Sequence, residues 1–118
     1  MVIYSSIRNK KWKWFFYPVI SVYITSFNKG KYLRQAITSV LNQSLQPEEI
    51  IIVDDGSNDN SREIIKEFAS RYPEIIKPII NENNYGIAKT RNIAISHCKG
   101  ELITFVDGDD YFFPSKLE

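Results

Sequence analysis

The sequence has little of several features that would point to a particular class of protein. It holds a single cysteine, Cys98, which excludes an intramolecular disulfide and agrees with a reducing, cytoplasmic compartment. Its formal net charge is only +1, so no overall field attracts nucleic acid, and we expect no nucleic-acid partner. No stretch approaches the ~18 consecutive apolar residues that mark a membrane-spanning helix. The 118 residues, 43% hydrophobic and 25% charged, are typical of a globular domain.

The first 18 residues differ in composition from the rest of the chain. Three lysines, at positions 10, 11 and 13, interleave with the aromatic residues Trp12, Trp14, Phe15, Phe16 and Tyr17. Basic residues with tryptophan at short spacing suit a membrane interface. Pro18 interrupts the stretch and no small-residue cleavage site follows, which argues against a signal peptide. We interpret residues 1–18 as a basic and aromatic leader, with peripheral contact at the inner face of the membrane and packing on the domain edge as alternatives.

From Val19 onward, two hydrophobic periods alternate along the chain. Short β-branched or apolar runs predict four strands, at residues 19–25, 49–53, 75–80 and 102–106. Each interval between them carries apolar residues at helical spacing, which predicts a helix, and Pro114 suits the start of a further one. Pro78 lacks a backbone N–H, so we expect the third strand at a sheet edge. Strands that alternate with helices predict an α/β domain with a parallel sheet.

Polar side chains end or directly follow three of the predicted strands. Thr25 ends the first, the turn Asp54-Asp55-Gly56-Ser57 follows the second, and Asp107, Asp109 and Asp110 follow the fourth. Parallel strands end at one edge of the sheet, where ligands bind near the point at which strand order reverses. Crowded carboxylates repel one another, and a hard cation such as Mg²⁺ or Mn²⁺ relieves that repulsion. The alternative is a solvated acidic turn, because Asp and Gly are common turn residues.

The third predicted helix carries an arginine on its apolar side. Ile87, Ala94, Ile95 and Cys98 form its expected apolar face, and Arg91 lies on the same stripe. An arginine that points inward needs an anion, because a buried unpaired charge is very unfavourable. An Asp at the sheet edge and a phosphate group are the two partners we expect.

Two glycine-rich phosphate-binding motifs are missing. The first strand is followed by Phe27-Asn28-Lys29-Gly30 and not by G-x-G-x-x-G, which disfavours a dinucleotide-binding domain. Gly30-Lys31 is followed by Tyr32, where a P-loop requires Ser or Thr. Any nucleotide site must therefore use another arrangement.

A set of motifs, taken in order, resembles the first half of the family-2 glycosyltransferases. It includes Ser26-Phe27-Asn28, Ser39-Val40-Leu41-Asn42-Gln43-Ser44, the run from Glu49 to Asp59, Asn84-Tyr85-Gly86, Arg91-Asn92 and Asp107-Gly108-Asp109-Asp110. The resemblance covers residues 19–118 and is specific as a set. It implies a GT-A fold, a Rossmann-like α/β sheet with flanking helices that binds a nucleotide-diphosphate sugar.

The resemblance implies roles for individual residues in nucleotide binding. Thr25 lies where the family's first strand contacts the nucleoside. Asp55 lies where a carboxylate accepts from the base, typically from the N3–H of uracil, which favours a UDP-sugar. Asp54 supports that turn, and Arg91 fits a place near the pyrophosphate. Asp107 belongs to the Asp-x-Asp motif, one end of which usually holds the ribose side.

The same resemblance implies Mn²⁺ or Mg²⁺ as the cofactor. Asp107 and Asp109 occupy the two ends of the Asp-x-Asp motif, and Asp110 follows immediately. We therefore expect the metal ligands among Asp107, Asp109 and Asp110. A bound cation would stabilise the charge that develops on a departing nucleoside diphosphate.

The implied reaction is inverting transfer of a sugar to a hydroxyl of a glycan or lipid-linked acceptor, most commonly in surface polysaccharide or glycolipid synthesis. A general base must deprotonate that hydroxyl. In the family this carboxylate lies well downstream of the Asp-x-Asp motif, so we expect it beyond Glu118. Residues 19–118 thus correspond to the N-terminal, donor-binding half of a truncated domain. The alternative is a non-catalytic remnant that binds a nucleotide sugar.

Overall fold

The computed structural model describes residues 18–118, so the expected leader at residues 1–18 lies outside the described part except for Pro18. The elements in this part are β1 (Ile20–Ser26), α2 (Gly30–Leu41), β2 (Glu49–Asp54), α3 (Ser61–Arg71), β3 (Ile76–Ile80), α4 (Ile87–His97) and β4 (Leu102–Asp107). The predicted α/β class is confirmed. Between residues 18 and 118 no helix has both the length and the apolar character that crossing a bilayer requires.

The strands form a four-stranded parallel sheet in the order β3-β2-β1-β4. Pro78 lies in β3 at one edge of the sheet, as predicted. Proline has no backbone N–H and cannot donate the hydrogen bonds that a central strand makes to both neighbours. The chain moves from β1 through β2 to β3 and then returns to place β4 on the other side of β1. Strand order therefore reverses between β1 and β4, where Thr25 is the register partner of Asp107.

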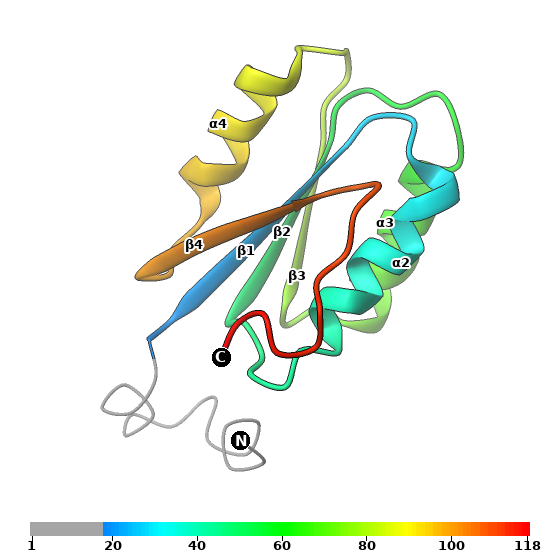
Figure 1. Ribbon diagram of the computed structural model, residues 1–118. Coiled ribbons are helices and arrows are strands. Elements are labelled where there is room, and N and C mark those ends of the chain that lie inside the picture. The colour runs from blue at the N-terminus through cyan, green and yellow to red at the C-terminus, as the bar shows by residue number, and fades with distance from the viewer. Residues whose placement is uncertain (1–17) are drawn as a thin grey trace.

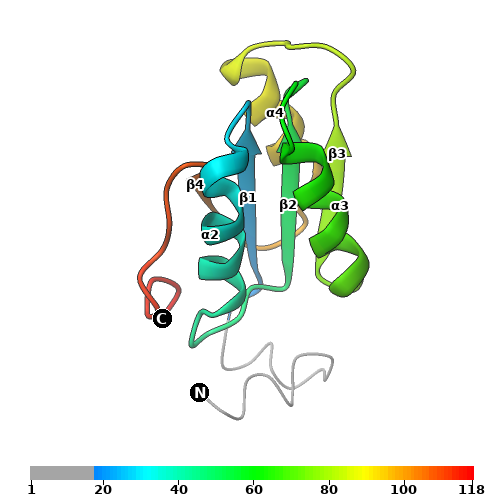
Figure 2. The same cartoon turned by 90° about the vertical axis from the view of Figure 1, so that its right-hand side faces the viewer.

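Helices cover both faces of the sheet. Helices α2 and α3 lie on one face and α4 lies on the other, as the two views show (Figures 1 and 2). The larger core forms on the α2 and α3 face, where Val22, Ile24 and Ile52 are fully buried. On the α4 face a smaller cluster joins Tyr23 and Ile51 to the helix. Successive side chains of a strand point to opposite faces of the sheet, so each central strand contributes residues to both cores.

The expected apolar face of α4 is wrong at two positions. Ile87 is 56% exposed and Ile95 is 44% exposed, whereas Thr90 and Ala94 are the buried residues of this helix. Isoleucines on more than one side of the helix make its apolar stripe ambiguous in the sequence. Contact with the sheet selects the side that carries Thr90 and Ala94.

The further helix expected at Pro114 is also wrong. Residues 114–117 form hydrogen-bonded turns, in which the N–H of Lys116 bonds the carbonyl of Phe113 at 3.1 Å. After β4 the chain crosses to the α2 side of the sheet (Figure 1). There Gln43 donates its side-chain amide to the carbonyl of Phe113 at 2.6 Å, which ties the segment to the end of α2.

Candidate functional site

A cavity of about 380 Å³ opens at the carboxyl edge of the sheet. Its walls come from the ends of β1 and β4, the turn after β2 and the first turns of α4. The volume falls within the range of ~300–1,000 Å³ that small-molecule sites occupy. Of the seven site residues expected from the sequence, five line the cavity, namely Thr25, Asp55, Arg91, Asp107 and Asp109. The other two, Asp54 and Asp110, do not.

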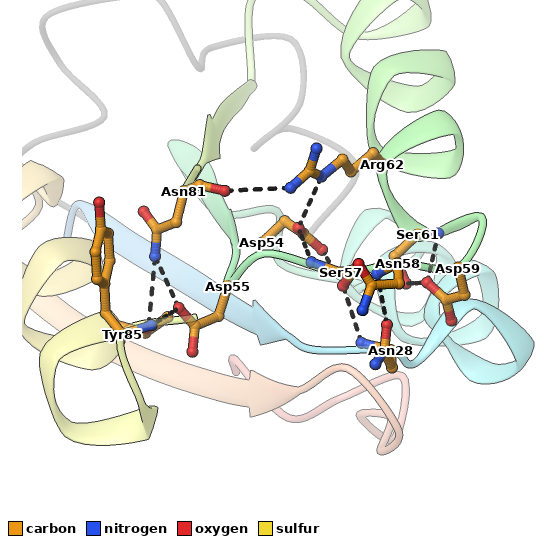
Figure 3. A network of polar contacts seen from close by, with 11 residues as sticks. Asn28, Asp54, Asp55, Ser57, Asn58, Asp59, Ser61, Arg62, Asn81 and Tyr85 are labelled. Atoms are coloured by element: carbon orange, nitrogen blue, oxygen red, sulfur yellow. Dashed lines mark hydrogen bonds and ion pairs between the residues drawn. The ribbon is translucent and has the colours of Figure 1, made fainter. Parts of the chain in front are cut away.

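Asp55 is held by donors from the loop between β3 and α4 (Figure 3). Its Oδ1 accepts the backbone N–H of Tyr85 at 2.8 Å and the side-chain amide of Asn81 at 3.1 Å. Its Oδ2 accepts the N–H of Gly86 at 3.0 Å. Only 4% of this residue is exposed, so the carboxylate is fixed in one orientation at the cavity wall.

The hydrogen bonds also set the charge of Asp55. Burial by itself raises the pKa of its carboxyl group, because a less polar environment disfavours the charged form. The hydrogen bonds from the backbone of residues 85 and 86 and from the Asn81 and Thr90 side chains together outweigh burial, and they hold the pKa below the ordinary value of 3.8. Asp55 is therefore ionised at neutral pH and offers only acceptor atoms to a ligand.

Asp54 has a different environment, although it is the adjacent residue. Its fully buried carboxylate accepts the N–H of Ser57 at 2.9 Å and lies 3.5 Å from the guanidinium of Arg62 in α3 (Figure 3). Neighbouring residues of an extended chain point to opposite faces of a sheet, which separates it from Asp55. Asp54 thus closes the turn after β2 from the α3 side.

Arg91 and Asp107 face each other across the end of the sheet. Arg91 Nη2 lies 3.6 Å from Asp107 Oδ1, and the same oxygen accepts the hydroxyl of Thr25 at 3.3 Å. The guanidinium lies over the ring of Phe105, 5.3 Å from its centroid, and Phe105 stacks on Tyr23. The sequence predicts either an Asp at the sheet edge or a phosphate group as the anionic partner of Arg91. The structure shows the former, Asp107.

The carboxylates after β4 have separate partners. Asp109 Oδ2 lies 3.0 Å from Lys29 Nζ, and Asp110 Oδ1 accepts the N–H of Tyr111 at 2.8 Å. Among residues 18–118, no three Asp, Glu, His or Cys side chains gather into a group that could hold a metal ion. Asp107 and Asp109 nevertheless fit a Mg²⁺-type ion, which commonly uses one or two carboxylates and completes its shell with water and substrate phosphates.

Two polar atoms at this cavity have no partner. Within the described part of the chain, Ser26 Oγ and Arg91 Nε are buried side-chain atoms without a hydrogen bond, and both residues line the cavity. Buried polar atoms in folded proteins are nearly always paired. Two unpaired ones at a single cavity are the pattern expected of a site that receives a polar ligand.

A second network holds the loop after β1 against the turn after β2. The N–H of Asn28 bonds Ser57 Oγ at 2.9 Å, and the N–H of Asn58 bonds Asn28 Oδ1 at 2.8 Å (Figure 3). Asp59 accepts the N–H of Gly30 at 2.9 Å and the N–H of Ser61 at 2.9 Å. One carboxylate therefore bonds the first residue of both α2 and α3 and ties the two loops together.

Asp59→Ala is expected to lower the free energy of unfolding by about 1 kcal/mol at pH 7, because the first N–H groups of two helices lose their acceptor. Burial alone raises the pKa of Asp59, but hydrogen bonds from Ser61 and Gly30 hold it below 3.8. A depressed pKa stabilises the fold above the unfolded-state pKa, and this contribution is lost as the pH falls through the folded-state pKa. Urea unfolding should therefore show a gap between wild type and variant at pH 7 that narrows below about pH 3.8. A gap that does not change with pH would contradict this assignment.

The sequence patterns assign no individual role to three residues of the site, although Ser26 belongs to one of the motifs that carry the resemblance. Ser26 and Lys29 follow Thr25 at the end of β1, and Asn81 directly follows β3. Asn81 is 6% exposed and bonds Asp55, so it positions the carboxylate from behind. All three lie at the carboxyl ends of strands, and that position is the one sequence signal that points to them.

The fold is that of an α/β domain with a cavity at its topological switch point. Residues 21–118 match the model of glycosyl transferase family 2, and the chain belongs to this family. An uncharacterised glycosyltransferase of Nostoc is 43% identical over 99 residues, which is 84% of this chain and 30% of that protein. A chondroitin synthase of Pasteurella multocida is 37% identical over 101 residues, 86% of this chain and 10% of that protein.

Solved structures agree on the fold. TarS of Staphylococcus aureus in complex with UDP superposes with a TM-score of 0.74 at 32% identity, covering 84% of this chain and 30% of that one. A mannosyltransferase of Pyrobaculum calidifontis in complex with GDP-mannose and Mn²⁺ gives a TM-score of 0.75 at 21% identity, over 86% of this chain and 30% of that one. The expected GT-A fold is confirmed. The chain spans less than half the length of each of these proteins.

Proposed function

We propose that residues 19–118 form the donor-binding part of a metal-dependent, inverting glycosyltransferase that uses a UDP-sugar. The observation that carries the proposal is the cavity itself. One concave site joins an ionised acceptor, Asp55, to a cation, Arg91, and to two carboxylates, Asp107 and Asp109. A nucleotide diphosphate with its metal ion needs these three kinds of group.

The base and the ribose are assigned to the buried end of the site. Asp55 accepts the N3–H of uracil, because its carboxylate is ionised and fixed by the loop before α4. Thr25 contacts the nucleoside from the end of β1, where its hydroxyl already bonds Asp107. The complex of TarS with UDP-GlcNAc, 32% identical over 83% of this chain, supports a uridine nucleotide as the donor.

The diphosphate is assigned to the side of the cavity that Arg91 lines. The Arg91–Asp107 pair is 41% and 46% exposed, and exposed ion pairs contribute only about 0–1 kcal/mol. Arg91 can therefore turn its unpaired Nε and its terminal nitrogens to phosphate oxygens at little cost. Asp107 and Asp109 would hold Mn²⁺ or Mg²⁺, with Asp110 next to them, and the ion would act as a Lewis acid on the leaving diphosphate.

Transfer also requires a general base. The acceptor hydroxyl must lose its proton to a general base, and we place that base beyond Glu118 in the remainder of a longer enzyme. The acceptor is a hydroxyl of a glycan or a lipid-linked glycan, and the setting is surface polysaccharide or glycolipid synthesis on the cytoplasmic side of the membrane. The similarity to a chondroitin synthase supports this class of acceptor.

UDP with Mn²⁺ is expected to raise the melting temperature by about 10 °C at a ligand concentration ~100 times the Kd, which corresponds to about 2.7 kcal/mol. UDP with EDTA should give a clearly smaller shift, because no metal ion then bridges the diphosphate to Asp107 and Asp109. GDP with Mn²⁺ is the matched control, since it changes the base and keeps the diphosphate. No shift with UDP and Mn²⁺ would overturn the proposed function, and equal shifts with and without metal would overturn its metal dependence.

A further inference from the structure

Each carboxylate of the Asp-x-Asp motif is paired with a cation from a different side of the sheet. Arg91 of α4 lies 3.6 Å from Asp107, and Lys29, which directly precedes α2, lies 3.0 Å from Asp109. Both cations line the cavity. Arg91 belongs to α4 and Lys29 directly precedes α2, and these two helices cover opposite faces of the sheet (Figures 1 and 2).

We propose that Lys29 is a second ligand for the diphosphate of the bound nucleotide, and that its pairing with Asp109 keeps it at the cavity before the nucleotide arrives. The inference rests on the proposed function and adds a residue to the same site. With the nucleotide and a divalent cation bound, Asp109 would hold the metal ion in place of the lysine, and the ammonium group of Lys29 would bind a phosphate oxygen.

The backbone of Lys29 is fixed next to the acidic loop. Its carbonyl accepts the N–H of Leu33 at 2.8 Å and so begins α2. A Cβ placed on Gly108 would lie 3.3 Å from the Cβ of Lys29 and 3.3 Å from the Cβ of Ser26. The Cβ of the lysine therefore lies next to Gly108 in the Asp-x-Asp loop, and its ammonium group reaches Asp109 at the cavity.

The ion pair is suited to exchange. Both side chains of the Lys29–Asp109 pair are 42% exposed, and pairs of this kind are weak because solvent screens them. A divalent cation carries twice the charge of the lysine and binds carboxylate oxygen directly, so it displaces the ammonium group. A lysine ammonium is a compact charge with three donors, which suits a phosphate with oxygens in several directions.

Lys29 makes the charge of the cavity less negative near the phosphates. Asp55, Asp107 and Asp109 contribute three negative charges, and Arg91 and Lys29 contribute two positive ones. Without Lys29 the cavity would present a larger negative charge to a diphosphate. The unpaired hydroxyl of Ser26, next to Lys29 and Gly108, offers a further donor to the same phosphate group.

The test compares Lys29→Met with Lys31→Met. Lys31 is exposed, does not line the cavity and has its Nζ 5.6 Å from the ring centre of Tyr32, so it controls for loss of a nearby charge. NMR titrations with UDP and with uridine, both in saturating Mg²⁺, separate the phosphate contribution from the base contribution. Lys29→Met should weaken UDP binding about tenfold or more, the size expected for a charged hydrogen bond, and should leave uridine binding unchanged. Lys31→Met should change neither.

Mn²⁺ titration without nucleotide, followed by electron paramagnetic resonance, gives an independent readout. Lys29→Met should bind Mn²⁺ more tightly than wild type, because Asp109 no longer has a competing cation. Unchanged UDP binding in Lys29→Met, or an equal loss of UDP and uridine binding, would overturn the role of Lys29 and leave the proposed function in place. Weaker Mn²⁺ binding in the variant would overturn the exchange at Asp109. Absence of UDP binding by the wild-type protein would instead overturn the proposed function.

Discussion

Gly56→Ala is expected to lower the free energy of unfolding by about 2–5 kcal/mol, because two separate costs add at this position. Gly56 has φ of +78°, a left-handed conformation that disfavours any residue with a Cβ. An added Cβ would also lie 2.7 Å from the carbonyl carbon of Asn83 and 2.8 Å from the nitrogen of Asn84. These are backbone atoms, so the contact can be relieved only if the loop before α4 moves.

Movement of that loop would also disturb the site. The N–H groups of Tyr85 and Gly86, which orient Asp55, follow Asn84 directly. We therefore expect the folded fraction of Gly56→Ala to bind UDP more weakly than wild type. Urea unfolding and a UDP titration at low temperature measure the two effects.

Gly86→Ala is the comparison variant, because it adds a Cβ at a positive φ without a steric contact. Gly86 also has a positive φ, +93°, but an added Cβ would meet no atom within 4 Å. This variant should show backbone strain alone, of about 1–3 kcal/mol. A loss of stability in Gly56→Ala of less than about 2 kcal/mol would contradict an added steric cost at residues 83 and 84.

Asp55→Asn is expected to weaken UDP binding roughly 10- to 100-fold, the loss that accompanies removal of a charged hydrogen bond. The amide also places an NH₂ group against one of the two backbone N–H groups that the carboxylate now accepts. That mismatch leaves a buried donor without a partner and costs about 1–3 kcal/mol of stability. Binding and stability should therefore fall together in this variant.

Asp54→Asn separates the two effects. Asp54 is fully buried and bonds Ser57 and Arg62 on the α3 side, so its replacement should also destabilise the fold. It does not line the cavity, and the folded protein should keep nearly the UDP affinity of wild type. Calorimetric titrations at 15 °C, with circular dichroism to confirm folding, compare the two variants. Equal losses of affinity would show that Asp55 acts only through the stability of the turn.

Local patterns in the sequence located most of the elements. The strand predicted at residues 19–25 is β1 at Ile20–Ser26, and the strand predicted at 102–106 is β4 at Leu102–Asp107. These predictions succeed because a β-branched apolar run bounded by turn residues has few alternatives in an α/β chain. Helix α4 shows the limit of the same method. Its isoleucines lie on several sides, so only contact with the sheet decides that Thr90 and Ala94 are buried.

The sequence also determined which segments end at the ligand-binding edge, because every strand of a parallel sheet has its carboxyl end there. That rule alone predicts that Thr25, Asp55 and Asp107 share one edge of the sheet, and all three line the cavity. It does not distinguish Asp54 from Asp55, since both follow the same strand. Helices α3 and α4 lie on opposite faces of the sheet. Asp54 therefore has a structural role on the α3 side, and Asp55 has a place in the site on the α4 side.

The pairing of Lys29 with Asp109 was decided by the tertiary structure alone. The two residues lie 80 positions apart, and their contact depends on β4 taking its place beside β1. Strand order is set by how the whole chain buries its apolar faces, and no local pattern encodes it. The sequence by itself determined the carboxylates and the hydroxyl of Thr25 at the site, because each ends or follows a recognisable strand. The tertiary structure determined which groups face one another, because side-chain contacts across a sheet depend on strand order, register and the helices that cover each face.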